Sequence, residues 1–347
     1  MDPSVYIPAY LQRAYLASHP ELTDAARELV HNDVNVNPHK YAQTEHAQAL
    51  LSYAGVHRHL LDELHRIEDM GSDEEFEQTR NRLFDDMRDE LLKIVRIDAH
   101  VLDAQLLAII LADTSVDACL GDLMKLEATT ADYLQQSVPG FDMEAPHYWA
   151  NNVLTDGVTA ADLTVSEPAL IGWLHTLETI SQLCMASARY RAAANYARRV
   201  LKAEGYPTRA AGTVLLALAR LEDQDGFFAL AHQLEEQVGA DALENSPWYL
   251  LARTILLFKT NKMRPATRAL REFANRCEGG AFFLLNPMYQ TPYLPCRPEP
   301  RDPWDLSHQA VWEADGIISD TPDFAPWANA CEDVSQLAQE FARRYGF

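Results

Sequence analysis

Residues 188–201 place the strongest constraint on the fold of this chain. They read Ala-Arg-Tyr-Arg-Ala-Ala-Ala-Asn-Tyr-Ala-Arg-Arg-Val-Leu. The pattern predicts a helix that starts near Tyr190, with small residues at Ala193 and Ala197 that let a neighbouring backbone come close. Val200 and Leu201 complete its apolar stripe. A helical hairpin of this kind exposes an apolar side that only another hairpin can cover, so the segment favours a stacked helical array.

The composition also favours helices. Hydrophobic residues make up 48% of the 347 positions, which argues against disorder, and only 14 positions are Gly. Acidic side chains number 51 against 29 basic ones, which gives a net charge of −22. Nucleic-acid binding needs clustered Lys and Arg to contact phosphates, so a nucleic-acid partner is unlikely on this composition.

Helical spacing of apolar residues extends over most of the chain. The predicted helices lie at about 41–69, 73–96, 100–112, 115–136, 167–187, 189–204, 208–221, 224–238, 246–260, 263–277, 304–319 and 331–345. Ser72 is expected to cap one helix, and Pro247 suits the first position of another. Prolines between 278 and 304 exclude an uninterrupted helix there, and we expect Gly279-Gly280 to end a helix.

These signals give a domain organisation in four parts. An N-terminal helical segment covers 1–136 and includes a possible first repeat unit near 73–112. Residues 137–165, rich in Pro, Gly and Asp, form a loop and the best internal boundary. The repeat region covers 166–277, and a Pro/aromatic segment with closing helices covers 278–347.

Cysteine usage and the N-terminal sequence predict a cytoplasmic protein. The five cysteines are Cys119, Cys184, Cys277, Cys296 and Cys331. They are widely spaced and odd in number, as expected for reduced thiols. Residues 1–6 lack a basic stretch followed by an apolar one, so we expect no signal peptide. The longest apolar runs are too short for a membrane span, so we expect no membrane contact.

The region 167–205 can be aligned with a 34-residue tetratricopeptide (TPR) unit. With Ala193 at the small position of the second helix, Leu177 and Ile180 fall on packing positions of the first. Ser181 then falls on the small position of the first helix, and Cys184 on a position that is usually aromatic. The predicted fold is therefore all-α, with TPR-like antiparallel helix pairs stacked in a right-handed superhelix. An irregular helical bundle is the alternative.

Residues 95–347 also resemble a known family. The landmarks, in chain order, are Ile97-Asp98 before Leu102-Asp103-Ala104, Gly140-Phe141 before Trp149, Glu167-Pro168, the Leu-rich pair at 213–237, Asn286-Pro287 leading to Tyr293-Leu294, and Trp312 with Thr321-Pro322 and Trp327. In this order they resemble bacterial TPR proteins related to the suppressor-of-tumorigenicity family. Gln290-Thr291 lengthens the Asn-Pro segment relative to that family. The resemblance implies a TPR-like protein that acts through protein contacts, and it supplies no catalytic residues.

The alignment also predicts a partner-binding surface. The concave face of the unit at 167–205 would present His175, Glu178, Gln182 and Met185 to a protein or peptide. Arg191 and Arg198, on the following helix, could clamp a carboxylate or phosphate of the partner. The alternatives are an ordinary solvated helix face for the first four residues, and pairing with this chain's own acids, such as Glu178 and Glu204, for the arginines.

No catalytic motif is present, and no cofactor is expected. The chain contains no G-x-S-x-G, P-loop or G-x-G-x-x-G. The only dense group of metal-ligand types runs from His57 to His65, where His59 and Glu63, and Asp62 and His65, form pairs that face different directions. The predicted function is a non-enzymatic adaptor or scaffold with a protein or peptide partner. The alternative is a metal- or ligand-dependent enzyme or regulator that uses the His57–His65 helix.

Overall fold

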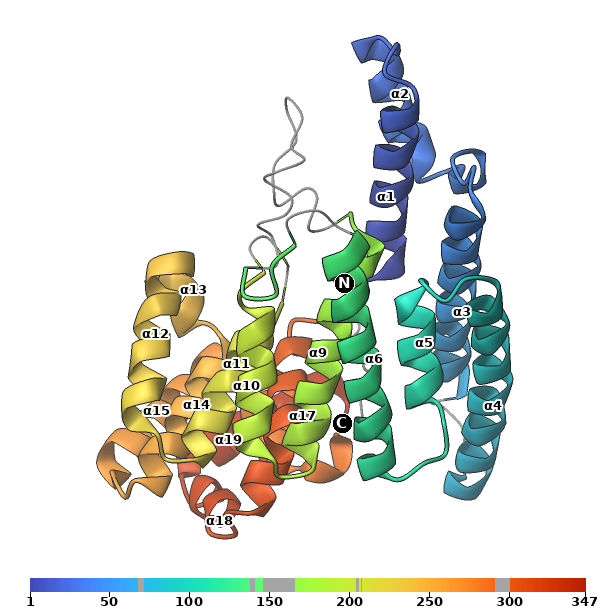
Figure 1. The fold of residues 1–347 in the computed structure, drawn as a ribbon. Coiled ribbons are helices and arrows are strands. Elements are labelled where there is room, and N and C mark those ends of the chain that lie inside the picture. The colour runs from blue at the N-terminus through green and yellow to red at the C-terminus, as the bar shows by residue number, and fades with distance from the viewer. Residues whose placement is uncertain (68–71, 138–140, 146–165, 204–205, 207, 291–299) are drawn as a thin grey trace. The chain divides into compact units, whose positions relative to one another are not determined.

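The structure, a computed structural model, describes residues 1–67, 72–137, 141–145, 166–203, 206, 208–290 and 300–347. These residues form 17 α-helices and two short 3₁₀ helices, and none of them forms a β-strand. The predicted all-α fold is therefore confirmed (Figure 1). The described helices also contain no segment long and apolar enough to cross a membrane.

The chain divides into two compact units. The first contains residues 1–177 and 202–207, and the second contains residues 178–201 and 208–347. The division falls inside helix α9 (Pro168–Ala186). The boundary predicted at 137–165 falls mostly on residues 138–140 and 146–165, which lie outside the described residues, so it stays a prediction.

The first unit is a set of helices that pack on their neighbours in sequence. They are α1 (Pro3–Ser18), α2 (Asp24–Val34), η1 (Pro38–Lys40), α3 (Glu45–Ile67), α4 (Asp73–Ile97), α5 (Leu102–Ile110) and α6 (Val116–Ser137). Helix α1 packs on α3, α3 on α4, α4 on α5 and α5 on α6. The predicted cap at Ser72 is confirmed, because its hydroxyl accepts a hydrogen bond from the Glu75 backbone N–H.

The second unit holds the predicted repeat region and the closing helices. They are α10 (Tyr190–Val200), α11 (Ala210–Arg220), α12 (Gln224–Val238), α13 (Ala240–Glu244), α14 (Pro247–Lys259), α15 (Met263–Arg276), α16 (Gly280–Leu285), η2 (Pro287–Tyr289), α17 (Asp305–Ser319), α18 (Phe324–Asn329) and α19 (Glu332–Tyr345). Pro247 occupies the start of α14, as predicted. Gly279, in a left-handed conformation, separates α15 from α16.

Three hairpins in this unit share one turn. Ala188, Glu222 and Asn261 are the only non-glycine residues with positive φ in the described chain, at 59°, 59° and 58°. Each follows the first helix of a pair: α9 with α10, α11 with α12, and α14 with α15. In each turn, the next residue's N–H donates to the carbonyl five residues back: Arg189 to Cys184, Asp223 to Leu218 and Lys262 to Leu257. A helix that ends in a left-handed residue with this hydrogen bond ends in a Schellman motif.

The spacing of the three turns is nearly regular. Positions 188 and 222 are 34 residues apart, and positions 222 and 261 are 39 apart. The short helix α13 lies in the longer interval and accounts for its extra length. Five residues after each turn residue comes a fully buried side chain, Ala193, Phe227 or Ala266. The three hairpins therefore repeat in backbone geometry as well as in sequence position.

Successive hairpins of this unit pack against one another, because α10 packs on α11 and α11 packs on α14. Helix α14 also packs on α15, the second helix of its own hairpin. Helix α17 packs on α11, α14 and α16. Gly212 of α11 lies directly against Trp248 of α14, where a Cβ atom would come within 2.3 Å of the indole. The contact between these two first helices therefore requires glycine.

Candidate peptide-binding site

His175 is the first of the predicted partner-binding residues, and the structure buries it in the first unit. Its Nδ1 lies 2.9 Å from Asp103 Oδ1, and its Nε2 lies 2.6 Å from the amino nitrogen of Met1. The Tyr6 hydroxyl donates to Asp103 at 2.5 Å. An ammonium group only donates, so Nε2 accepts and Nδ1–H donates to Asp103. The predicted exposure of His175 on a concave face is therefore wrong.

The buried carboxyl group of Asp103 is the polar partner that accompanies the burial of His175. Asp103 is 4% exposed, and burial alone would raise its pKa. His175 and the Tyr6 hydroxyl outweigh that effect and hold the pKa of Asp103 below its usual value. A second histidine, His57, is 4% exposed nearby in the same unit; its Nε2 has no hydrogen-bond partner within the described chain, and burial lowers its pKa.

Met185 is also buried, at 3% exposure, so its predicted place on an open surface is wrong as well. Helix α17 approaches here, because a Cβ atom on Gly316 would lie 3.8 Å from the Met185 carbonyl oxygen. Gln182 is half-buried, and Glu178 accepts a hydrogen bond from the Thr208 hydroxyl. The binding roles of Gln182 and Glu178 stay predictions.

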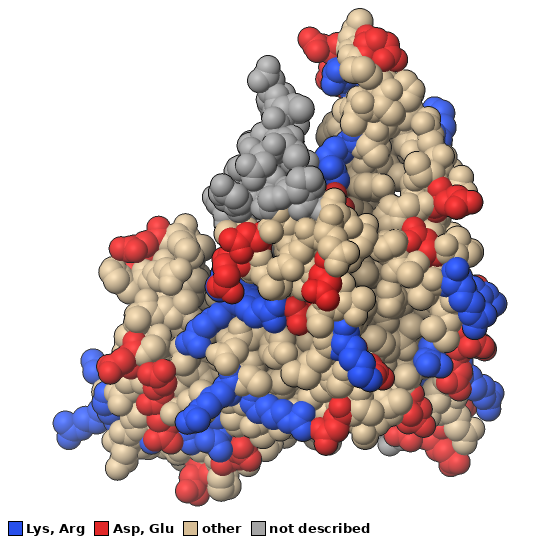
Figure 2. All heavy atoms as spheres, in the orientation of Figure 1, with Lys and Arg blue, Asp and Glu red and all other residues tan. Residues whose placement is uncertain are grey.

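Arg191 and Arg198 are exposed on α10, and neither has an ion pair with any described residue. The expected pairing with Glu178 is not made, and Glu204 lies outside the described residues. Figure 2 shows basic side chains over α10 on a face that also carries many acidic ones. The two arginines therefore remain available to a partner, and their role stays a prediction.

The helix from His57 to His65 has no metal-binding geometry. Among the described residues, no three His, Cys, Asp or Glu side chains are grouped so that they could hold a metal ion. His57 points into the core, whereas His59 and His65 are exposed. Of the cysteines, the described four are free thiols, and Cys296 lies outside the described residues. Burial raises the pKa of Cys277 to about 12.

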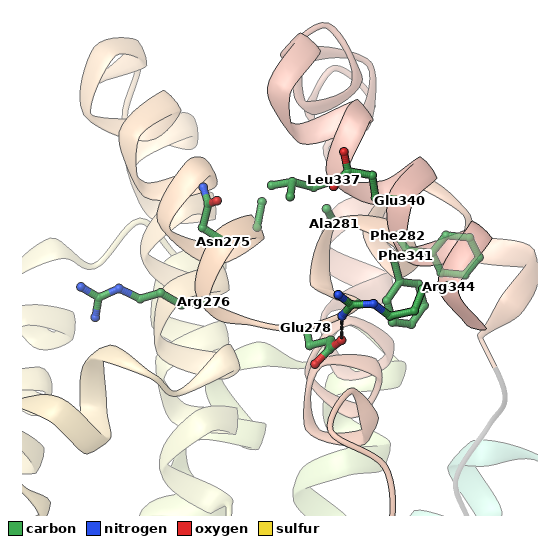
Figure 3. A pocket seen from close by; sticks show the side chains of 11 residues that line it. Asn275, Arg276, Glu278, Ala281, Phe282, Leu337, Glu340, Phe341 and Arg344 are labelled. Carbon is green, nitrogen blue, oxygen red and sulfur yellow. Dashed lines mark hydrogen bonds and ion pairs between the residues drawn. The ribbon is translucent and has the colours of Figure 1, made fainter. Parts of the chain in front are cut away.

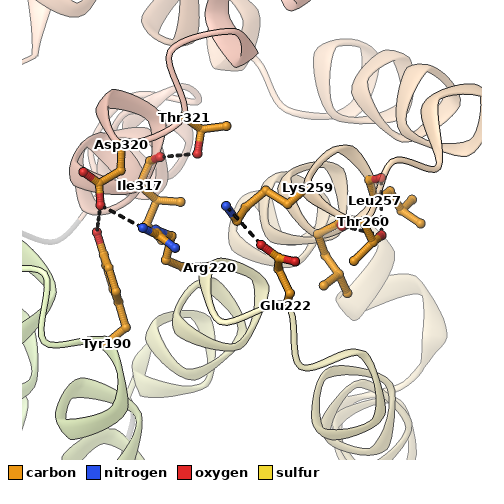
Figure 4. A network of polar contacts seen from close by, with 10 residues as sticks. Tyr190, Arg220, Glu222, Leu257, Lys259, Thr260, Ile317, Asp320 and Thr321 are labelled. Carbon is orange, nitrogen blue, oxygen red and sulfur yellow. Dashed lines mark hydrogen bonds and ion pairs between the residues drawn. The ribbon is translucent and has the colours of Figure 1, made fainter.

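Hydrogen bonds connect α17 to helices α10, α11 and α14 of the second unit. The Thr213 hydroxyl and Trp248 Nε1 both donate to Glu313, which is 7% exposed. At the end of α17, Tyr190 and Arg220 donate to Asp320, each at 3.2 Å (Figure 4). The side of α11 and α14 that carries these donors is therefore covered by α17.

An open pocket lies elsewhere in the second unit, between α15, α16 and α19 (Figure 3). Its volume is about 440 Å³. It is lined by Ala274, Asn275, Arg276, Glu278, Gly279, Ala281, Phe282, Leu337, Glu340, Phe341 and Arg344. Apolar side chains form one part of the lining, and charged or amide side chains form the rest. These described lining residues include no hydroxyl, thiol or imidazole group of the kind that nucleophilic catalysis uses.

Glycine at positions 279 and 280 shapes this pocket. Gly279 adopts φ 75°, a conformation that side-chain-bearing residues rarely adopt. A Cβ atom on Gly280 would come within 2.7 Å of the Phe273 ring. The sequence predicted a helix end here, followed by a Pro/aromatic segment. It gave no signal that α19, which begins 52 residues after Gly280, would form the opposite wall.

Ion pairs hold the charged side chains around the pocket. Arg344 lies 2.7 Å from Glu278, which also accepts from the Tyr345 hydroxyl at 2.9 Å. Arg276 lies 2.9 Å from Glu244. Glu340, in contrast, has no ion pair with any described residue. Both guanidinium groups of the described lining therefore form ion pairs. The Glu340 carboxylate is the one charged group of that lining that does not.

Comparison with known proteins adds no assignment to this geometry. No protein-family model matches the chain, no curated protein matches it, and no solved structure matches it. The resemblance to the suppressor-of-tumorigenicity family therefore rests on the sequence landmarks alone.

Proposed function

We propose that this chain is a non-enzymatic adaptor that binds a protein segment on a TPR-like helical array. Three hairpins with one turn geometry support a repeat, and the 34-residue interval between the first two turns equals the TPR period. The landmarks shared with bacterial proteins of the suppressor-of-tumorigenicity family support the same assignment. We include in the proposal a right-handed superhelix and a cytoplasmic location. Stacked helix pairs of this kind form extended binding surfaces.

The observation that carries the proposal is the open pocket between α15, α16 and α19. Peptide and small-ligand sites combine an apolar lining with a few polar groups that fix orientation. Phe282, Phe341 and Leu337 supply the apolar part of this pocket. Its volume of about 440 Å³ suits one or two side chains of an inserted peptide rather than a folded domain.

The polar groups define the chemistry of the segment. The Asn275 amide nitrogen donates to the Arg271 carbonyl at 2.7 Å, which leaves its oxygen to accept a peptide N–H. The Glu340 carboxylate can pair with a basic side chain. The net charge of −22 favours a basic partner as well. The ligand of this proposal is a peptide in which a large apolar residue lies beside Lys or Arg.

A peptide selection tests this function. A displayed random-peptide library is selected against the full chain, and enriched peptides are measured by isothermal titration calorimetry. Leu337→Arg places a charged group in the pocket, whereas Gln336→Arg adds the same charge at an exposed position of the same helix. We expect Leu337→Arg to weaken binding about tenfold or more, since one buried apolar contact contributes about 1–3 kcal/mol, and Gln336→Arg to leave it unchanged.

Two results would contradict the proposal. One is a selection that enriches no apolar-basic peptide. The other is a peptide that binds wild type and Leu337→Arg equally, with both proteins melting at the same temperature. The second result would place the binding surface outside this pocket.

A further inference from the structure

Helix α17 is attached to the array through a row of hydrogen bonds at three levels. From its N-terminal to its C-terminal part, Gln309 accepts from Arg209, Glu313 accepts from Thr213 and Trp248, and Asp320 accepts from Tyr190 and Arg220. In all five bonds the donor belongs to α10, α14, α11 or the residue that precedes α11, and the acceptor belongs to α17 or its cap. The array therefore offers a ladder of donors to an acceptor-bearing helix.

The acceptor positions share one side of α17. Positions 309, 313 and 320 are 4 and 7 residues apart, which is the spacing of one helix face. The apolar residues buried on this helix are two alanines and two β-branched residues: Ala310, Val311 and Ala314 are fully buried, and Ile317 is 1% exposed. The helix therefore meets its neighbours through apolar side chains together with carboxylate and amide oxygens.

Such a contact depends on polar complementarity as well as on apolar area. Alanine contributes little transfer free energy, because hydrophobic stabilisation scales with the apolar area removed from water. A carboxylate such as that of Glu313, at 7% exposure, is costly to desolvate, and the hydrogen bonds from Thr213 and Trp248 contribute to offsetting that cost. A second helix that offers the same acceptors can accept the same five hydrogen bonds.

We infer that the side of α10, α11 and α14 that carries these donors is a helix-binding groove, and that α17 is the ligand it holds in cis. The partner that fits the groove is an amphipathic helix of another protein, with acidic or amide side chains at positions i, i+4 and i+11 and apolar residues between them. Donors on the groove and acceptors on the helix give the charge complementarity. This site is separate from the pocket at α15, α16 and α19, and it does not depend on the function proposed for that pocket.

Because α17 belongs to the same chain, a partner helix must displace it from the groove. A tethered helix has an effective concentration on the order of millimolar, so a partner helix competes only when α17 opens or when its own bonds are weakened. Local opening of α17, without unfolding of α11 and α14, is therefore a requirement of the inference.

Hydrogen–deuterium exchange on the full wild-type chain tests that requirement. We expect the backbone amides of α17 after Glu313 to exchange about tenfold faster or more than the amides of α11 and α14. Equal rates in the three helices would show that α17 opens only with the whole unit, and that result would overturn the inference. This measurement needs no substitution, so it decides even where a variant fails to fold.

A peptide competition tests the chemistry of the groove. The probe is a fluorescein-labelled synthetic peptide of residues 303–321, measured by fluorescence anisotropy against the full chain. We expect Glu313→Ala protein to bind the probe about tenfold or more tighter than wild type, because its own α17 is weakened. The probe that carries Glu313→Ala should lose this binding. Asp320→Ala, at a position 45% exposed, is the second variant, with the same direction expected. Equal binding of the probe to wild type and to both folded variants would overturn the inference.

Discussion

Substitution of Gly212 by Ala is a sharp test of the contact between α11 and α14. An ideal Cβ atom at this position would lie 2.3, 2.4 and 2.7 Å from three atoms of Trp248. Trp248 is not free to move away, because its Nε1 donates to the buried Glu313 at 2.7 Å. Overpacking of a fixed neighbour costs about 3 kcal/mol at the upper end of its range. The gain in helix propensity from Gly to Ala is about 1 kcal/mol.

The net expectation for Gly212→Ala is a loss of about 2 kcal/mol. In a unit of this size, that corresponds to a melting temperature roughly 4–8 °C lower. Gly316→Ala is the matched control in the same unit, since its Cβ atom would meet its nearest neighbour at 3.8 Å, an ordinary contact distance. The control should raise stability by up to about 1 kcal/mol. Circular dichroism melts measure both. A Gly212→Ala protein that is more stable than wild type would refute the close approach of α11 and α14.

Further substitutions probe three buried polar groups, those of Glu313, Asp103 and His57. Glu313→Ala should destabilise the second unit by about 1–3 kcal/mol, because the hydrogen bond from Trp248 is left unmade. Glu313→Gln keeps an acceptor oxygen and should restore part of the lost stability. Urea unfolding measures the stability of both variants. Asp103→Asn should cost the first unit about 1.5–3 kcal/mol, the range for hydrogen bonds to a charged group, in the same assay. His57 has its pKa lowered by burial, so the unfolded chain takes up its proton first, and stability should fall as the pH drops below about 6.5. His57→Leu should reduce that loss, and His59→Leu, exposed on the same helix, should not; melts from pH 7 to pH 5 distinguish them.

The helices of this chain could be predicted from sequence because their signals are local. Apolar spacing, the Ser72 cap and Pro247 each act within one turn of the residue concerned, and the ends of the twelve predicted helices agree with the structure to within a few residues. Helices α1, α2, α13, α16 and α18 were not predicted. The helix predicted to start near Tyr190 begins at that residue, two positions after the left-handed turn residue Ala188.

The candidate sites could not be predicted in the same way, because they depend on contacts distant in sequence. His175 is buried by Asp103, 72 residues away, and Asp103 in turn holds Tyr6, 97 residues away. One local signal was present: the six residues that precede His175 in α9, 169–174, are all apolar or glycine, which is typical of a buried helix segment. The packing of α17 on α11 and α14 had no such signal, since Glu313 accepts from Thr213, 100 residues earlier.

The most direct test of the adaptor function is the exchange footprint of a selected peptide on the full chain. Hydrogen–deuterium exchange is compared with and without a saturating apolar-basic peptide. The proposed pocket predicts slower exchange in the last two turns of α15 and in α19 between Leu337 and Arg344, with α10 unchanged. Protection confined to α10, or no protection anywhere in the second unit, would contradict a binding site between α15, α16 and α19.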